Sequence, residues 1–174
     1  MGLNFTPPTG QELPLNNERK LRPSMDEPQV PLIKIVRDGL ERVCKEFTEY
    51  LSQHGFVRSK KMLWIRSNGE SLECISFFRR GSTYGSAHTA SVDIRVAFFT
   101  EKVGHPSESG RRNGPWSDKL RDAKGYAYHL RFNASSWSTY DRCLDDLARL
   151  VIEHGLPWFA MTTTNLSIAD ITAN

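Results

Sequence analysis

The sequence lacks long apolar runs and the short motifs that mark common enzymes. Crossing a bilayer takes roughly 18 consecutive apolar residues, and no stretch of this 174-residue chain reaches that length. The first residues have no basic start followed by an apolar run, so we expect no signal peptide and a cytoplasmic location. A phosphate-binding loop, Gly-x-Ser-x-Gly, His-Glu-x-x-His and Cys-x-x-Cys are also missing from the sequence. We therefore expect no cofactor.

Cysteine and histidine are few and widely spaced. The cysteines are Cys44, Cys74 and Cys143, and the histidines are His54, His88, His105, His129 and His154. None of these residues has the close spacing of a zinc site, so we predict no metal centre. We interpret the cysteines as buried thiols of a reducing compartment rather than as nucleophiles, because no sequence neighbour would activate them.

The composition is that of an ordinary globular chain. Hydrophobic residues make up 39% and charged residues 25% of it, which is enough apolar material for one core. The net charge of +3 is mildly basic. That balance is compatible with a nucleic acid or an acidic protein as a partner but requires neither of them.

Proline and apolar content divide the chain. Residues 1–29 hold five of the nine prolines and few large apolar side chains, so we predict a flexible tail there. A single domain is expected over residues 30–162. Residues 163–174 are polar and are predicted to form a second tail.

Helical periodicity is strong in two segments. Apolar residues recur at three- and four-residue steps over 31–54 and 138–154, which predicts two amphipathic helices. Gly55 and Gly155 follow the last periodic positions, where a left-handed cap is common. We expect Pro157 to prevent the second helix from restarting.

Alternating patterns predict four strands, at about 62–66, 72–79, 90–98 and 126–132. Between the first two, Asn68-Gly69 is the dipeptide that a type I′ hairpin turn favours. We predict an α+β fold with an N-terminal helix, an antiparallel four-stranded meander and a C-terminal helix packed on one face of the sheet. Alternation over residues 90–98 leaves the other face polar.

One group of candidate site residues lies on that polar face. If the third and fourth strands pair, Asp93, Arg95, His129 and Arg131 share it, and Arg79 would join them. Such residues are typical of cross-strand charge pairs on a solvated face. The same set would also suit general base catalysis on an anionic substrate.

A second candidate is the long connection over about residues 100–125. It carries Arg111 and Arg112 close to Trp116. Arginine and tryptophan are favoured anchors of protein interfaces, and they also suit phosphate contact and base stacking. A plainer alternative is a solvated loop whose tryptophan packs back on the domain.

A family resemblance rests on the strings Phe47-x-x-x-Leu51-x-x-x-Gly55-Phe56, Trp64-x-Arg66, Leu72-x-x-Ile75-x-Phe77, Ser91-Val92-x-Ile94-x-Val96 and His154-Gly155-Leu156-Pro157-Trp158-Phe159. Over about residues 40–160 the chain resembles the bacterial domain of unknown function 4304 family. The resemblance implies an α+β domain without an assigned activity, similar to small immunity proteins that block a toxin domain.

These observations favour a cytoplasmic, non-enzymatic binding protein, for example an immunity-like inhibitor of a toxin domain. Two alternatives stay open. One is a nucleic-acid-binding domain that uses the basic loop and the polar sheet face, and the other is an enzyme that acts on an anionic substrate at that face.

Overall fold

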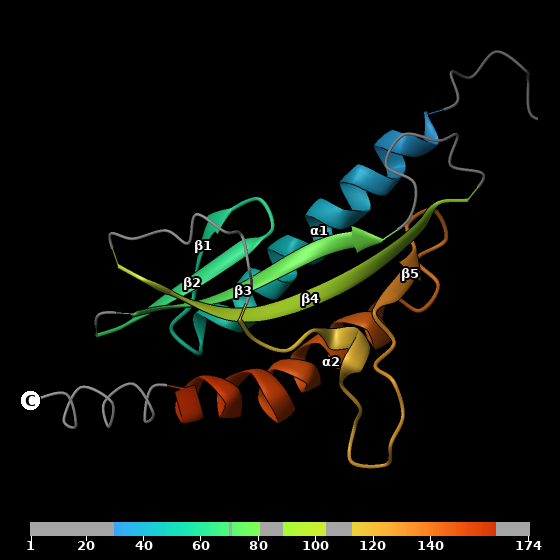
Figure 1. Ribbon diagram of the computed structural model, residues 1–174. Coiled ribbons are helices and arrows are strands. Elements are labelled where there is room, and N and C mark those ends of the chain that lie inside the picture. Colours follow the sequence, from blue (N-terminus) through green and yellow to red (C-terminus); the bar gives the residue numbers. More distant parts are fainter. Residues whose placement is uncertain (1–29, 70, 81–88, 104–112, 163–174) are drawn as a thin grey trace, which may run out of the picture.

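The computed structural model describes residues 30–69, 71–80, 89–103 and 113–162 (Figure 1). In chain order the elements are α1 (Leu32–Ser52), β1 (Val57–Lys60), β2 (Leu63–Asn68), β3 (Ser71–Arg80), β4 (Ser91–Lys102), the short 3₁₀ turn η1 (Ser117–Lys119), β5 (Arg131–Asn133), α2 (Tyr140–Leu150) and the π turn η2 (Val151–Gly155). The two predicted tails lie outside the described residues. The predicted α+β class and the two helices are confirmed.

The sheet has five strands rather than the predicted four. They follow one another in chain order and every neighbouring pair is antiparallel. The additional strand is β1, a short edge strand with a mostly exposed surface. Because a solvated edge strand buries almost nothing, its sequence has no apolar alternation by which to predict it.

The first predicted hairpin is confirmed, but its turn lies one residue further along. Asn68 pairs with Ser71, so the loop consists of Gly69 and residue 70, of which the latter lies outside the described residues. Gly69 takes the left-handed conformation at φ +61°. The prediction of Asn68 as a central turn residue was wrong, because Asn68 itself ends the strand β2.

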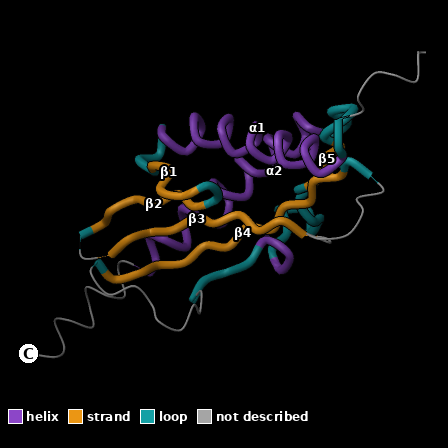
Figure 2. The backbone as a smooth tube through the Cα atoms, turned by 90° about the horizontal axis from the view of Figure 1, so that it is seen from above, coloured by secondary structure: helices purple, strands orange, loops and turns teal. Residues whose placement is uncertain are grey.

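Both helices pack on the same face of the sheet (Figure 2). On β4 the alternate residues Val92, Ile94, Val96 and Phe98 are buried in that core together with residues of α1 and α2. Gly39 of α1 is part of this contact. A Cβ atom built on it would lie 2.6 Å from the Cβ atom of Ala134, so glycine permits the close approach of the helix.

The sequence predicted that the C-terminal helix ends at Gly155, but the helix continues beyond this residue. It passes through η2 and remains helical over residues 156–162. A Cβ atom on Gly155 would lie 2.6 Å from Phe98 Cε1, so this glycine serves close packing rather than a cap. The π turn already shifts the helical hydrogen bonds just before Pro157, which has no N–H to donate. Phe159 beyond it is buried in the core.

The opposite face of the sheet is less polar than predicted. Cys74, Ala97 and Phe99 form a second buried cluster there, and Trp116 packs against it. Alternation over residues 90–98 does not reveal this cluster, because the apolar outward positions lie at the far end of β4. The outward-facing charged residues Asp93 and Arg95 lie in the other half of β4.

An ion pair between partly exposed Arg66 and buried Glu73 fastens the end of α1 to the sheet. Glu73 is 1% exposed, and its carboxylate accepts hydrogen bonds from Arg66 Nε at 2.6 Å and Asn68 Nδ2 at 2.8 Å. Arg66 Nη1 also donates to the carbonyl oxygen of His54 at 2.8 Å. Next to it Gly55, at φ +80°, closes the helix as predicted, with Phe56 N–H bonded to Leu51 O.

We predict that Glu73→Gln lowers the free energy of unfolding by about 2 to 4 kcal/mol, because Arg66 then loses its counter-charge inside the protein. Urea unfolding followed by circular dichroism measures the change. Glu49→Gln is the matched control, because Glu49 is exposed on α1, and it should change the value by less than about 0.5 kcal/mol. Equal stability of the two variants would contradict the structural role of Glu73.

Candidate functional site

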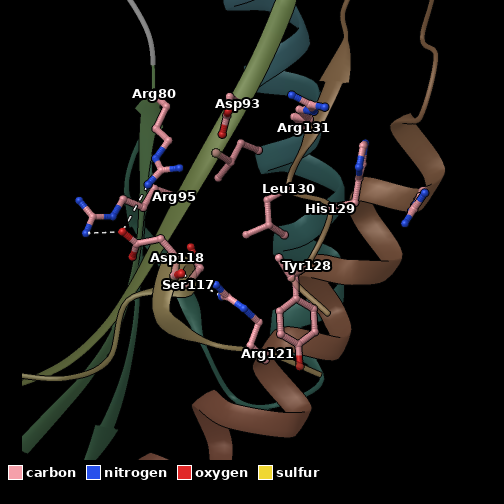
Figure 3. A pocket seen from close by; sticks show the side chains of 13 residues that line it. Arg80, Asp93, Arg95, Ser117, Asp118, Arg121, Tyr128, His129, Leu130 and Arg131 are labelled. Carbon is pink, nitrogen blue, oxygen red and sulfur yellow. Dashed lines mark hydrogen bonds and ion pairs between the residues drawn. The ribbon is translucent and has the colours of Figure 1, made fainter. Parts of the chain in front are cut away.

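The candidate site lies on the outer edge of β4, between two chain segments that each form hydrogen bonds to this edge. One segment leads into β5, and Ile94 N–H donates to Leu130 O at 2.8 Å there. The other runs over residues 113–117, and Val96 N–H donates to Ser117 Oγ at 2.9 Å. Between them a cleft of about 350 Å³ opens on the sheet edge (Figure 3).

The lining of the cleft is rich in charge. Its charged residues and its histidine are Arg80, Arg95, Arg121, Arg131, Arg142, Asp93, Asp118 and His129. Ile94 and Leu130 also border it, and both residues are buried in the core. Because five arginines meet two aspartates, the cleft has an excess of positive charge that favours anions.

On one side of the cleft the positive charge is partly neutralised. The Asp118 carboxylate forms ion pairs with Arg80 at 3.3 Å and Arg95 at 3.0 Å. The guanidinium carbon of Arg95 lies 3.9 Å from the centre of the Trp116 ring. Arg95 Nε and Asp118 Oδ1 are buried and have no hydrogen-bond partner, so the polar groups of this side are not fully satisfied.

The remaining arginines of the cleft carry unneutralised charge. Arg121, Arg131 and Arg142 are exposed and form no ion pair with a residue that the structure describes. Arg121 Nη1 donates to two main-chain oxygens, those of Asp118 at 2.9 Å and Leu120 at 2.7 Å. Arg131 and Arg142 come from β5 and α2, so different elements present them to one cleft.

His129 is held by its backbone rather than by its ring. Its N–H donates to Asp146 Oδ2 at 2.7 Å, which fixes the residue against α2. The ring atom Nε2 is buried and without a hydrogen-bond partner.

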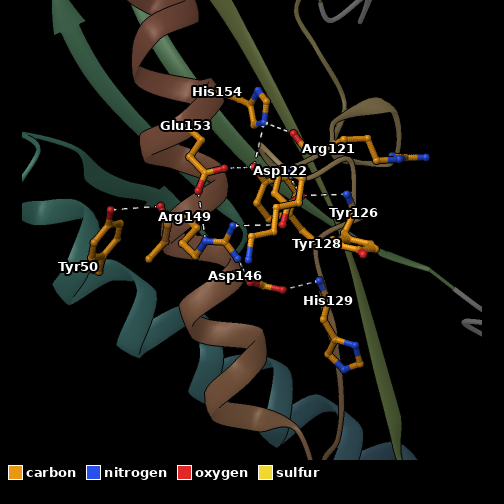
Figure 4. A network of polar contacts seen from close by, with 12 residues as sticks. Tyr50, Arg121, Asp122, Tyr126, Tyr128, His129, Asp146, Arg149, Glu153 and His154 are labelled. Atoms are coloured by element: carbon orange, nitrogen blue, oxygen red, sulfur yellow. Dashed lines mark hydrogen bonds and ion pairs between the residues drawn. The ribbon is translucent and has the colours of Figure 1, made fainter.

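A polar network holds the cleft wall against the C-terminal helix (Figure 4). Tyr128 Oη donates to Glu153 Oε2 at 2.5 Å. His154 Nε2 lies 2.9 Å from Tyr128 Oη and 2.9 Å from Arg121 O. Burial, reinforced by the bond to Glu153, raises the pKa of the Tyr128 phenol. The phenol therefore stays protonated and keeps donating at neutral pH.

Asp122 fixes the turn that leads back to the cleft. Its Oδ1 accepts hydrogen bonds from the N–H groups of Tyr126 and Lys124, both at 2.9 Å. These bonds, first the one from Tyr126, lower the pKa of Asp122, so the carboxylate remains charged well below neutral pH. Arg149 contacts the same carboxylate at 3.5 Å and thereby links the turn to α2.

The structure places most of the predicted face residues together. Asp93, Arg95, His129 and Arg131 all line the cleft. Arg79 does not join them, because its Cα partner is the core residue Ile94. The expected fourth strand is short. Only Arg131–Asn133 is a strand. Residues 126–130 form one main-chain hydrogen bond to the sheet, from Ile94 N–H to Leu130 O.

Of the predicted loop site the structure describes only Trp116, and its role as a partner anchor stays a prediction. Trp116 is half-buried, and its ring centre lies 5.2 Å from that of Phe78. Arg111 and Arg112 lie outside the described residues. Sequence reasoning missed Arg80 and Arg142 as cleft residues. The cross-strand position of Arg80, opposite Asp93, would follow from a correct strand register, but the place of Arg142 on α2 requires the tertiary fold.

The comparisons with known proteins give no family. No family model matches the chain, and no curated protein or solved structure matches it significantly. The resemblance to the domain of unknown function 4304 family and the role that it implies therefore stay predictions. None of the helices described is long and apolar enough to cross a membrane. Within the described ranges no three potential ligands gather into a metal site.

The cysteines are free and buried, as predicted. Burial raises the pKa of the thiols of Cys44 and Cys143 to about 12. A raised pKa means that the folded protein holds these thiols protonated at neutral pH, and a protonated thiol is a poor nucleophile.

We predict that none of the cysteines in the native protein reacts with Ellman's reagent within minutes at pH 8. Burial blocks access to all three, and it also suppresses the thiolate of Cys44 and Cys143. Absorbance of the released thiolate measures the reaction. The protein in guanidinium chloride is the control and should release the full amount for the three cysteines. Rapid stoichiometric labelling of the native protein would show that one of them is accessible and reactive.

Proposed function

We propose that this chain is a binding protein whose cleft receives an anionic group of its ligand. The observation that carries the proposal is the pair Arg131 and Arg142, which are exposed, line the cleft and have no ion pair among the described residues. A guanidinium group presents its donors in a planar fork that matches carboxylate and phosphate oxygens. Two such groups, presented by separate elements, give the cleft unpaired positive charge that attracts an anion.

Hydrogen bonds in the cleft wall indicate that the cleft is ordered before a ligand binds. Asp122, Tyr128 and His154 fix the chain between η1 and β5 through hydrogen bonds to main-chain groups and to Glu153 of η2. A site that is ordered before binding loses less conformational entropy when the ligand arrives. An immunity-like inhibitor would use the same cleft for an acidic side chain of its toxin domain, and this narrower role remains a proposal.

We predict that inorganic phosphate produces saturable NMR shifts at the amide signals of residues 129–131 and 142. Arg131→Gln combined with Arg142→Gln should weaken this binding at least about tenfold, because each charge-assisted hydrogen bond contributes about 1.5 to 3 kcal/mol. A titration of ¹⁵N-labelled protein measures both effects.

The control for this titration is Arg37→Gln combined with Lys45→Gln. It removes the same charge from exposed positions of α1 that do not line the cleft, and it should leave the phosphate affinity nearly unchanged. If phosphate at 50 mM (roughly the upper range for a weak anion site) shifts no cleft signal, or if both double variants bind equally, the proposed function is wrong.

A second candidate function is nucleic-acid binding, and it rests on a different observation. Lys119 and Lys124 are exposed on either side of Arg121, so positive charge extends from the cleft along the neighbouring turn. Evenly spread positive charge suits a phosphate backbone rather than a single anionic group.

For this candidate we predict that a fluorescent single-stranded RNA binds and that its affinity falls steeply with salt. Releasing counterions from a few phosphates gives a slope of log affinity against log salt of roughly −0.7 per contact. Lys119→Gln combined with Lys124→Gln should make that slope shallower in fluorescence anisotropy. An affinity that is absent at low salt, or a slope that the double variant leaves unchanged, would eliminate nucleic-acid binding here.

A further inference from the structure

Asp93 is an unneutralised carboxylate in the middle of the arginines. It stands opposite Arg80 on one side and Arg131 on the other in the strand register. Nevertheless it forms no ion pair within 4.0 Å with a residue that the structure describes, whereas Arg80 pairs with Asp118. Figure 3 shows the Asp93 side chain between these two arginines at the upper part of the cleft.

The cleft therefore presents both signs of charge at the same time. A purely anionic ligand bound to Arg131 and Arg142 would also meet the negative charge of Asp93, and like charges at short range cost free energy. A purely cationic ligand would meet the arginines. Only a ligand that carries both charges finds a favourable partner for each of them, and this complementarity is a source of specificity.

The size of the cleft fits a small molecule. Its volume of about 350 Å³ lies near the lower end of the range of roughly 300 to 1,000 Å³ for small-molecule sites. Ile94 and Leu130 border the cleft but are buried in the core and expose almost no apolar surface, so a ligand is recognised mainly by the charged groups. A flat protein epitope or a nucleic-acid backbone would not require this combination.

We propose that the cleft binds a small amphoteric molecule of amino-acid size. Its phosphate or carboxylate lies at Arg131 and Arg142, and its protonated amine lies at Asp93. This inference rests on the proposed function, because it assumes that the cleft receives an anion. It adds the chemical class of the ligand and assigns a specificity-determining role to Asp93.

The test compares two ligands that differ only in the cationic group. O-phosphoethanolamine carries an ammonium group where 2-hydroxyethyl phosphate has a hydroxyl. In isothermal titration calorimetry we expect the first to bind about tenfold or more tightly, since one added ion pair at a half-buried carboxylate contributes on the order of a factor of ten. The pair 3-aminopropyl phosphate and 3-hydroxypropyl phosphate repeats the comparison at a longer spacing.

Two variants separate the roles of the charges. Asp93→Asn should abolish the preference for the amine and leave the hydroxyl ligand bound equally or more tightly. Arg131→Gln should weaken both ligands, and Arg142→Gln replaces it if that variant does not fold. Asp38→Asn, which removes an exposed carboxylate of α1, is the control and should keep the preference. Thermal unfolding of each variant establishes that it is folded.

The outcomes distinguish this inference from the proposed function. Equal affinity for the amine and hydroxyl ligands at both spacings, weakened together by Arg131→Gln, would overturn the amphoteric ligand and leave anion binding in place. A preference that survives Asp93→Asn would overturn the role of Asp93. If neither phosphate binds, anion binding itself fails and this inference fails with it.

Discussion

Among the described residues no single segment pairs with the full length of the outer edge of β4, and the cleft lies where one partner segment ends and the next begins. β4 spans Ser91–Lys102, whereas β5 pairs with only its first three residues. Unpaired main-chain groups on a buried edge are costly, so a second segment, residues 113–117, bonds to the far part of the edge. Both segments run antiparallel to β4, and the chain leaves the edge after Ser117 and returns to it at Leu130. Charged side chains line the space between these two points.

The cleft keeps its shape because its wall is fastened to the helical layer rather than to the sheet. The chain between η1 and β5 has little sheet bonding, and side chains of α2 and η2 take its place. Asp146 accepts a bond from the backbone of His129, and Glu153 accepts one from Tyr128. Arg149 contacts both of these carboxylates and Asp122 as well. One cationic side chain thus joins three carboxylates, and an ordered network of this kind limits the motion of the wall.

The prediction from sequence was correct where a long helix or strand has one regular apolar periodicity. The helix α1 and the strand β4 bury a regular stripe, and the pattern of Val92, Ile94, Val96 and Phe98 identifies its face without tertiary information. It failed for β1, which buries almost nothing. At the C-terminal helix, the sequence pattern indicated a helix end at Gly155. Glycine is needed there because a Cβ atom would collide with Phe98, and the helix does not end at this residue.

The candidate site was predictable in part for the same reason. Residues on one strand keep their face, so Asp93 with Arg95 and His129 with Arg131 could be grouped from alternation alone. The assignment of Arg80 to the cleft face depends on the register of β3, because a shift by one residue moves a side chain to the other face. The sequence pattern predicted Arg79 on that face instead. Nothing local to Arg142 indicates the cleft, because it depends on how α2 crosses the sheet.

Burial explains which charges of the cleft are paired and which are left for a ligand. Arg95 lies against Trp116, and its side chain is 32% exposed, so leaving it without a counter-charge would cost more than for a solvated group. Asp118 supplies that charge. Arg131 and Arg142 are exposed, and water stabilises them at little cost to folding. A ligand must therefore replace that water, and the gain is greatest for a ligand that fills the cleft and removes water from both arginines and from Asp93 together.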